Sequence, residues 1–374
     1  MLVLHIISGM KVGGAEMALQ RLASHARGGR YEHVVASLSP GGAMRERFLD
    51  AGIELLVFDF KGAPLSSLLL LFRTLRQRRP VIVQTWMYHA DLIGGVVAKL
   101  AGVPHVIWGI RSTDVPGHGA RALRLIRAAC ARLSRRVPSV IACVAEAARR
   151  THVSLGYDDA RMRVVPNGFG TDVLAGRAAA RASLRGQLGL NADAIVIGCV
   201  GRFHPDKGQD IFVLASAVVA QALPGARFLM VGRDVTDANP ELMAWIAESG
   251  AAERFYLLGE RSDMQSCLAA MDVFCLASRT EGFPNVVGEA MALQVPCVVT
   301  DAGDAALLVG DTAAVVPVAD PPALGQALLE LARMAPAQRS VSGQAARQRI
   351  LAHYTMTRAG ERFTAIYDEL TMQG

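Results

Sequence analysis

The chain has 374 residues, of which 52% are hydrophobic and 19% are charged, and its 39 basic and 33 acidic residues give a formal charge of +6. This composition excludes a disordered or fibrous protein, and at this length two domains are the default expectation. The small basic excess is compatible with anionic substrates or membranes, but it gives no reason to expect nucleic acid as a partner.

The six cysteines show neither the paired spacing of a zinc site nor a Cys-x-x-Cys motif. Several lie in apolar runs typical of strands, so we expect buried free thiols and a reducing, cytoplasmic environment. No apolar tract approaches the ~20 residues that a membrane-spanning helix needs, and no basic leader precedes the first apolar run. We therefore expect neither a spanning segment nor a signal peptide.

Short runs rich in β-branched residues alternate with helical patterns along the whole chain. The first half contains predicted strands at Leu2–Ile7, Val34–Leu38, Val81–Thr85, Val106–Ile110 and Val140–Val144. The second half contains predicted strands at Ile195–Val200, Arg227–Val231, Phe255–Leu258, Val273–Leu276 and Val295–Thr300. Continuous apolar strands separated by helices indicate an α/β fold, with parallel sheets covered on both faces.

The segment 171–193 lies between the two series and is rich in Ala, Arg and Gly, which predicts a linker followed by a helix. We therefore expect an N-terminal domain of residues 1–170 and a C-terminal domain beginning at residue 171, each built on a Rossmann-like sheet. Ligands of open parallel sheets bind at the carboxyl ends of the strands, so the chemistry is expected there.

Two glutamates flank a turn that follows the predicted strand Val273–Leu276. Glu281 and Glu289 stand eight positions apart, with Gly-Phe-Pro-Asn directly after the first. Proline favours the first turn of a helix, so we expect a helix to begin near Pro284, with Glu281 at its mouth and Glu289 about two turns inside. The backbone amides between the two carboxylates form a natural anion site.

A second motif, residues 201–208, follows the predicted strand Ile195–Val200 and precedes a helical stretch. It carries Arg202 and Lys207, whose side chains are suited to phosphate oxygens. It is not a Walker loop, because no Ser or Thr follows the lysine. A weaker signal is Gly13-Gly14-Ala15-Glu16, where two glycines permit a tight turn close to a ligand.

Together these segments resemble the Glu-x7-Glu, Gly-Arg-x-x-x-x-Lys-Gly and Gly-Gly-x-Glu motifs of glycosyltransferase family 4, whose members are retaining GT-B enzymes. The resemblance implies a GT-B fold, in which two Rossmann-like domains face a cleft. It implies that residues 1–170 bind the acceptor, that residues 171–352 bind the nucleotide sugar, and that the helices in 353–374 return to the N-terminal domain. It also implies a retaining hexosyl transfer that needs no metal.

The resemblance assigns roles to individual residues of the donor side. Arg202 and Lys207 would hold the diphosphate and stabilise the charge on the leaving nucleotide, Glu289 would bind the ribose, and Glu281 would position the sugar. The remaining donor-side candidates are Gly14 at the phosphates, Leu258 and Gly259 at the base, and Gly282, Phe283, Pro284 and Asn285 near the donor sugar and diphosphate.

Polar and aromatic residues after two N-terminal strands are the acceptor-side candidates. They are Trp86, Tyr88, His89, Asp91 and Arg111. Three of them, Trp86, Tyr88 and Asp91, resemble a bacterial subgroup that builds capsules, exopolysaccharides and lipopolysaccharide. Many family members carry a histidine where Arg111 stands; His89 and His118 are alternatives for its place.

A basic amphipathic pattern runs through residues 119–137, where Leu123, Ile126 and Cys130 share one helical face. Five arginines, Arg121, Arg124, Arg132, Arg135 and Arg136, fall on the far side, with Arg127 at the flank. We expect either a solvated basic face or a surface that rests on anionic lipid at the inner face of the cytoplasmic membrane.

The function expected is transfer of a sugar from a nucleotide donor, UDP-linked, to a hydroxyl of a growing surface glycan, with a lipid-linked acceptor as one option. Two alternatives stay open at this point: a sugar-nucleotide epimerase with the same two domains, and a non-catalytic protein that binds sugar nucleotides.

Overall fold

The computed structural model describes residues 1–26, 28–113, 121–191 and 193–372. The chain divides into two units, one formed by Met1–Gly168 with Met356–Gly374 and the other by Phe169–Thr355. The division into an acceptor-binding and a donor-binding domain that the sequence suggests stays a prediction.

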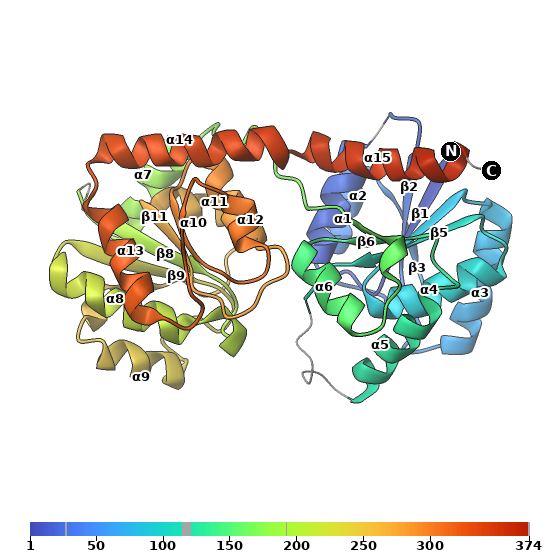
Figure 1. Cartoon of the computed structure of the whole chain (residues 1–374), viewed down its shortest axis with the longest axis horizontal. Helices are drawn as coiled ribbons and strands as arrows, with labels where there is room; N and C mark the ends of the chain where they lie inside the picture. Colours follow the sequence, from blue (N-terminus) through green and yellow to red (C-terminus); the bar gives the residue numbers. More distant parts are fainter. Residues whose placement is uncertain (27, 114–120, 192, 373–374) are drawn as a thin grey trace. The chain divides into compact units, whose positions relative to one another are not determined.

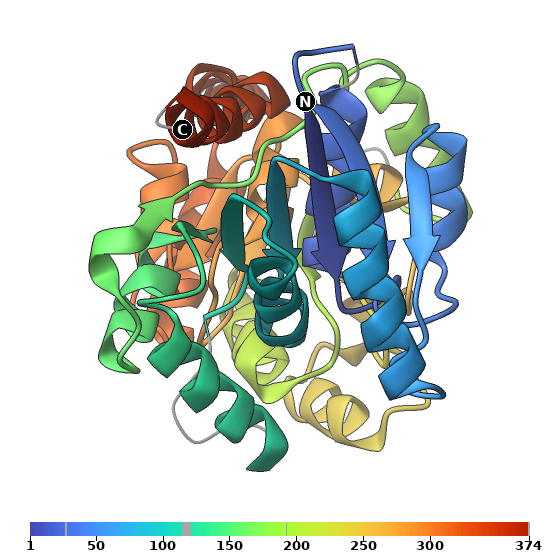
Figure 2. The same ribbon diagram turned by 90° about the vertical axis from the view of Figure 1, so that its right-hand side faces the viewer.

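The first unit is a parallel sheet with helices on both faces (Figures 1 and 2). In its described part, seven strands occur in the order β3-β2-β1-β4-β5-β6-β7. The strands are β1 (Leu2–Ile7), β2 (Glu32–Ser37), β3 (Glu54–Val57), β4 (Ile82–Trp86), β5 (His105–Ile110), β6 (Val140–Cys143) and β7 (Met162–Val164). The helices are α1 (Gly14–His25), α2 (Met44–Asp50), α3 (Pro64–Arg78), α4 (Tyr88–Leu100), α5 (Arg121–Leu133), α6 (Glu146–Ser154) and α15 (Met356–Met372), with a 3₁₀ turn η1 at Asp159–Arg161.

Two groups of helices cover the two faces of this sheet. On one side α1 packs against α2 and α15, and on the other α4 packs against α3 and α5. The C-terminal helix is fixed to the unit by Tyr367, which is fully buried and donates its hydroxyl to Oε1 of Gln84 in β4 at 2.5 Å. Helix α15 therefore completes the core of the first unit although it comes last in the chain.

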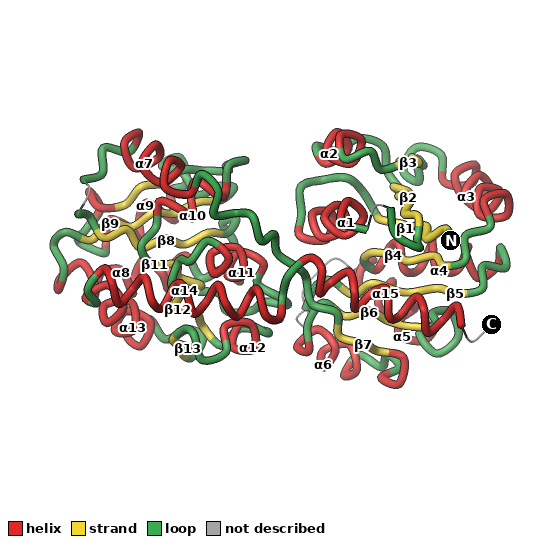
Figure 3. The backbone as a smooth tube through the Cα atoms, turned by 90° about the horizontal axis from the view of Figure 1, so that it is seen from above, coloured by secondary structure: helices red, strands yellow, loops and turns green. Residues whose placement is uncertain are grey.

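The second unit has the same plan with a smaller sheet (Figure 3). Its described strands occur in the order β10-β9-β8-β11-β12-β13 and are all parallel. The strands are β8 (Ile195–Val200), β9 (Ala226–Val231), β10 (Phe255–Leu257), β11 (Val273–Leu276), β12 (Cys297–Thr300) and β13 (Ala314–Val316). The helices are α7 (Arg177–Gln187), α8 (Gln209–Ala222), α9 (Pro240–Glu248), α10 (Met264–Ala270), α11 (Asn285–Ala292), α12 (Ala305–Val309), α13 (Pro321–Arg333) and α14 (Pro336–His353), with 3₁₀ turns η2 (Pro205–Lys207) and η3 (Ala252–Arg254).

The helices of the second unit again form two layers. Helix α8 packs against α9 and α13 on one face, while α11 packs against α10, α12 and α14 on the other. None of the helices in the described residues combines the length and apolar character that crossing a membrane requires. The six cysteines are all buried and free, which confirms the expectation of unpaired thiols in the core.

The predicted basic helix exists as α5, but one of its arginines is placed differently from the expectation. Residues 119 and 120 lie outside the described part of the chain, as does His118. The exposed arginines are those expected, whereas Arg127 is buried rather than at the flank. Burial raises the pKa of Tyr88 to about 12 and lowers that of His152 to about 4, and the charge of Arg127 acts on both groups. Arg127 therefore belongs to the packing of α5 on the unit.

Candidate functional site

The loop after β8 brings two basic residues to the carboxyl edge of the second sheet. It begins with backbone hydrogen bonds from Gly201 to Val231 and from Phe203 to Arg233, and it ends in η2. Gly208 closes the loop at φ 63°, where a Cβ would lie 2.0 Å from the carbonyl oxygen of Ala277. A glycine is therefore required here, and it lets the loop lie directly against the end of β11.

This close approach brings Lys207 to Glu281. The ammonium group of Lys207 donates to Oε1 of Glu281 at 2.6 Å, and the hydroxyl of Ser278 donates to the same oxygen at 2.7 Å. The Glu281 side chain is only 10% exposed, compared with 29% for Lys207. The carboxylate is therefore fixed in place, while the lysine keeps access to solvent.

The end of β12 and the loop after it hold the backbone on both sides of Glu281. Thr300 donates to the carbonyl of Ser278 at 2.7 Å, and the amide of Asp304 donates to the carbonyl of Gly282 at 3.0 Å. Gly303 has φ 61°, and a Cβ there would meet the carbonyl oxygen of Glu281 at 2.2 Å. Ser278 and Thr300 were not predicted as site residues, because a hydroxyl at a strand end carries no motif of its own.

The Gly-Phe-Pro-Asn turn behaves as expected from its proline. Pro284 occupies the N-cap position and α11 begins at Asn285, which places Glu289 in the second turn. Phe283 is buried, with its ring 6.1 Å from Phe169 and 5.9 Å from Tyr354. The turn is thus anchored by aromatic packing, and Gly282 and Asn285 remain partly exposed beside it.

The two remaining donor-side features lie along the same edge of the sheet. Leu258 and Gly259 follow β10, and the carbonyl of Gly259 accepts from the amide of Gly232 at 2.8 Å, after β9. The side chain of Arg202 is exposed, and it has no ion-pair partner among the residues that the structure describes. The second unit therefore gathers Arg202, Lys207, Glu281 and the Leu258–Gly259 step at one edge, with Glu289 in the adjoining helix.

Asp263 stands at the N-cap of α10, but its side chain accepts no capping hydrogen bond from the helix. Its carboxylate instead binds the guanidinium of Arg261 through two hydrogen bonds of 2.8 Å.

In the first unit the glycine pair occupies the entry to α1. Gly13 is the N-cap and Gly14 is the first residue of the helix, exposed to solvent. Glu16 follows in the first turn, and burial raises the pKa of its carboxyl.

Three acceptor-side candidates have buried side chains. Trp86 donates its indole N–H to Nδ1 of His5 at 3.2 Å, and the Tyr88 hydroxyl is hydrogen bonded to Nε2 of His152 at 2.8 Å. Asp91 is fully buried and accepts from Thr85 at 2.5 Å and from the amide of Gly109 at 3.2 Å. Burial raises the pKa of Asp91 to about 8.

The other two acceptor-side candidates remain accessible. His89 is exposed in the first turn of α4, and Arg111 is half-buried at the end of β5. The Arg111 guanidinium lies 4.8 Å from the Trp86 ring and donates to Oδ1 of Asn167, the asparagine of a Pro-Asn-Gly turn. Burial lowers the pKa of Arg111 to about 10, which leaves it charged at neutral pH.

No group of three or more His, Cys, Asp or Glu side chains suited to a metal ion was found in the described parts of the chain. Whether the reaction needs a metal stays a prediction for experiment.

Comparison with known proteins identifies the family. A model for glycosyltransferase family 4 matches residues 12–173, and a model for group 1 glycosyl transferases matches residues 194–334. The chain is 27% identical over 241 residues to a UDP-Gal:α-D-GlcNAc-diphosphoundecaprenol α-1,3-galactosyltransferase of Escherichia coli, in a match that covers 63% of this chain and 62% of that protein. It is 25% identical over 306 residues to the putative glycosyltransferase EpsF of Bacillus subtilis, covering 80% of this chain and 79% of that one.

Solved structures show the same fold over the whole chain. Anabaena HepE in complex with UDP-glucose superposes with a TM-score of 0.86 at 21% identity, covering 99% of this chain and 100% of that one. A sucrose-phosphate synthase from Thermosynechococcus elongatus gives a TM-score of 0.78 at 16% identity, with full coverage of both chains. The two parallel-sheet units thus form a GT-B fold, and the chain belongs to glycosyltransferase family 4.

Proposed function

We propose that this protein is a retaining glycosyltransferase that moves a hexosyl group from a UDP-linked donor to a hydroxyl of a growing, lipid-linked surface glycan. The observation that carries the proposal is the Lys207–Glu281 ion pair, with exposed Arg202 in the same loop, at the carboxyl edge of the second sheet. Such an edge is the usual ligand site of an open parallel sheet.

The relatives support a nucleotide-sugar donor. The Escherichia coli relative is named for UDP-galactose and a diphosphoundecaprenol-linked acceptor, and HepE was solved with UDP and with UDP-glucose. Another relative, from Corynebacterium glutamicum, is named as GDP-mannose-dependent. The choice of UDP therefore has to be tested against GDP.

The proposed roles of the side chains are those that the family resemblance implies, and the positions of these residues support them. Arg202 and Lys207 hold the diphosphate, and Glu289, in the second turn of α11, binds the ribose. Glu281 is held by Ser278 and so presents its carboxylate to the sugar in a fixed orientation. Leu258 and Gly259 lie beside the base, and the Gly282–Asn285 turn lies beside the sugar and diphosphate. When the diphosphate arrives, it shares Lys207 with Glu281.

In the proposed reaction, the bond between the sugar C1 and the diphosphate oxygen breaks and a bond from C1 to the acceptor oxygen forms on the same face. The proton of the acceptor hydroxyl passes to the leaving diphosphate, so the nucleoside diphosphate departs and no other reactant is needed. Preorganised cations at the leaving group stabilise its developing charge, and Arg202 and Lys207 supply them without a metal.

We also propose that α5 attaches the enzyme peripherally to the inner face of the cytoplasmic membrane, where a lipid-linked acceptor would be found. Five arginines of α5 and of the turn that follows it are exposed: Arg121, Arg124, Arg132, Arg135 and Arg136. Leu125 lies among them on α5 and is 72% exposed, which offers an apolar contact beside the charges.

The experiment that tests the activity is incubation of the full chain with UDP-hexoses and GDP-mannose, with and without a short polyprenyl-diphosphate sugar. A thermal-shift screen first selects the donor, since a ligand that binds only the folded state raises its stability. A product whose new glycosidic bond keeps the anomeric configuration of the donor supports the proposal. A new nucleotide sugar formed without an acceptor would identify an epimerase instead.

A further inference from the structure

A pocket in the first unit lies at the carboxyl ends of β1, β2 and β3. It has a volume of about 180 Å³ and is lined by Met10, Lys11, Ser39, Pro40, Gly41, Gly42, Asp59 and Lys61. Ligand pockets for whole cofactors or drug-sized molecules usually measure ~300–1,000 Å³. This pocket is therefore suited to one chemical group of a larger ligand.

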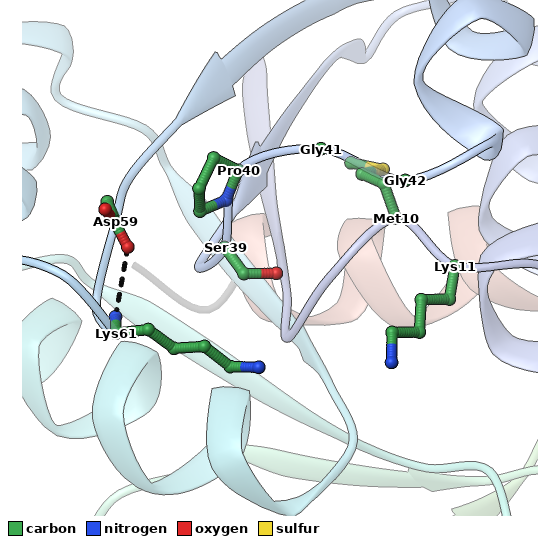
Figure 4. Close-up of a pocket in the computed structure, with 8 residues that line it drawn as sticks. All are labelled: Met10, Lys11, Ser39, Pro40, Gly41, Gly42, Asp59 and Lys61. Atoms are coloured by element: carbon green, nitrogen blue, oxygen red, sulfur yellow. Dashed lines mark hydrogen bonds between the residues drawn. The ribbon is translucent and has the colours of Figure 1, made fainter.

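Two lysines give the pocket its charge. Figure 4 shows Lys11 and Lys61 extending from two different loops, on the same side of the pocket as the Ser39 hydroxyl. Neither ammonium group has an ion-pair partner in the described residues. The chain has only four lysines among its 39 basic residues, so two of the four line one small pocket.

The one carboxylate in the pocket lining, that of Asp59, accepts hydrogen bonds from backbone amides of its own loop. Oδ1 of Asp59 accepts from the backbone amide of Gly62 at 2.8 Å and from that of Lys61 at 3.2 Å. This turn fixes the backbone from which Lys61 projects. The two lysines and Asp59 give the lining a formal net charge of +1.

The opposite wall is backbone held in an unusual conformation. Gly42 has φ 117°, and a Cβ there would lie 2.2 Å from the carbonyl oxygen of Met10. Only glycine lets the 41–42 segment lie this close to the loop that carries Lys11. Three loops therefore form the pocket together, and their close approach depends on this glycine.

We propose that this pocket is the subsite for a phosphate group of the acceptor. The proposal rests on the glycosyltransferase function proposed above. Lysine binds phosphate as a point charge, and a phosphate monoester carries close to two negative charges, which two unpaired ammonium groups match. A carboxylate carries one charge and would leave one lysine unmatched. A phosphate at the reducing end of a glycan would fix the acceptor while the rest of the sugar chain extends outside.

The four lysines make a direct test possible. Reductive methylation with ¹³C-formaldehyde keeps the lysine charge and gives each side chain its own NMR signal. Lys11→Arg and Lys61→Arg assign two signals, Lys207 reports on the donor site, and Lys99, exposed at the end of α4, is the internal control. UDP is added first to occupy the donor site, and the full chain is then titrated with inorganic phosphate, pyrophosphate or acetate at constant ionic strength.

The expected result is that phosphate and pyrophosphate move the Lys11 and Lys61 signals together and saturably, while the Lys99 signal stays in place. In the Lys11→Ala/Lys61→Ala variant the affinity for pyrophosphate should fall by about tenfold or more. Signals of Lys11 and Lys61 that move no more than that of Lys99, or that respond equally to acetate, overturn the proposal.

Two further measurements are needed. One distinguishes a soluble from a lipid-linked phosphate, and the other tests the proposed donor site separately from the pocket. A soluble sugar phosphate and a short-chain polyprenyl phosphate are compared: tighter binding of the second indicates a lipid-linked acceptor, and tighter binding of the first a soluble one. If UDP leaves the Lys207 signal unmoved, the proposed donor site fails, while the response of Lys11 and Lys61 is still scored separately.

Discussion

Lys207 and Glu281 are 74 positions apart in sequence, yet the lysine ammonium lies 2.6 Å from a carboxylate oxygen of the glutamate. The loops after β8 and β11 meet because these strands are neighbours in the sheet. Two motifs that are separate in sequence therefore form one ion pair, and removing either partner changes the electrostatic surroundings of the other. A lone buried carboxylate is costly, so the pair has to be tested as a pair.

The first prediction concerns the basic residues of the loop after β8. Arg202→Ala and Lys207→Ala should each lower turnover by about 10²–10³, the scale expected for losing one preorganised group that stabilises a leaving anion. The measurement is the steady-state rate of transfer, with Lys99→Ala as a control that removes the same charge elsewhere. Near-normal rates in both variants would remove this loop from the mechanism.

A double-mutant cycle refines this prediction. Lys207→Ala leaves Glu281, whose side chain is 10% exposed, without its cation, whereas Lys207→Ala/Glu281→Gln removes both charges. We expect the effects of Lys207→Ala and Glu281→Gln on the free energy of unfolding to be non-additive by about 0.5–3 kcal/mol, the range for residues in direct contact. Strict additivity would show that the contact has no energetic importance.

The second prediction separates the two glutamates. Glu289→Gln should weaken binding of UDP, because this residue stands in the second turn of α11 and is assigned to the ribose. Glu281→Gln should mainly slow transfer, because the residue is assigned to the sugar. Calorimetry with UDP and steady-state rates measure the two quantities. Equal, small effects of both substitutions on both quantities would favour two unrelated surface glutamates.

The third prediction is that transfer survives EDTA. Arg202 and Lys207 already place two positive charges in one loop at the edge of the sheet, so the leaving diphosphate has its counter-charge in the protein. The rate is measured before and after dialysis against the chelator. A rate that falls in EDTA and returns with magnesium or manganese would show that a metal does this work.

The strands that were predicted are those with continuous apolar runs. β1, β8 and β11 match their predicted bounds, and β2, β4, β5, β6, β9, β10 and β12 differ by one or two residues at one or both ends. The strands that were not predicted are β3, β7 and β13, which lie at edges of the two sheets. Edge strands are short and half-exposed, and these three lack the uninterrupted burial that produces an apolar run.

The candidate site shows a similar limit. The motifs led to Arg202, Lys207, Glu281 and Glu289 because their spacing resembles a family pattern. The hydroxyl of Ser278, three positions before Glu281 in the same loop, belongs to no such pattern. Lys11 and Lys61 belong to none either, because the pocket that they line forms only when the loops after β1, β2 and β3 come together within the first unit. Trp86 and Asp91 stand next to a strand end, which suggested ligand contact, yet their side chains are in the core.

The fourth prediction concerns Asp91 and pH. Burial raises the pKa of Asp91 to about 8, compared with ~3.9 for an unfolded aspartate. Between these two values the folded protein holds a proton that the unfolded chain has released, so the contribution of Asp91 to stability is fully present below about pH 4 and is lost as the pH rises to about 8. Asp91→Asn should remove this slope and stabilise the first unit near pH 8.

The measurement is urea unfolding between about pH 5 and 8. Trp86 and Trp108 are buried in the first unit and Trp245 lies in the second, so a Trp245→Phe background makes the fluorescence report on the first unit alone. Asp50→Asn, which changes an exposed carboxylate, is the matched control. An unchanged pH slope in Asp91→Asn would contradict the assignment. Any effect of this substitution on transfer is expected through Gly109, whose amide Asp91 holds at the end of β5.

The fifth prediction is that the enzyme binds anionic vesicles through α5. Basic residues near such a surface contribute about 1 kcal/mol each, which suffices for reversible attachment by several arginines. Co-sedimentation should increase with the fraction of anionic lipid and decrease with salt. Changing Arg121, Arg124, Arg132 and Arg135 to Gln should abolish it, whereas changing Arg45, Arg47, Arg150 and Arg333, which are also exposed, should leave most of it intact.

A second surface has to be separated from this one. Helix α3 exposes Leu65, Leu68, Leu69 and Leu70, which are 41–82% accessible and could contact lipid without a charge requirement. Replacing these leucines with serine should reduce binding less than the α5 arginine changes do, because the proposed attachment is electrostatic. Binding that ignores lipid charge and salt, and that is lost only in the α3 variant, would assign the membrane contact to α3 and leave α5 as a solvated basic helix.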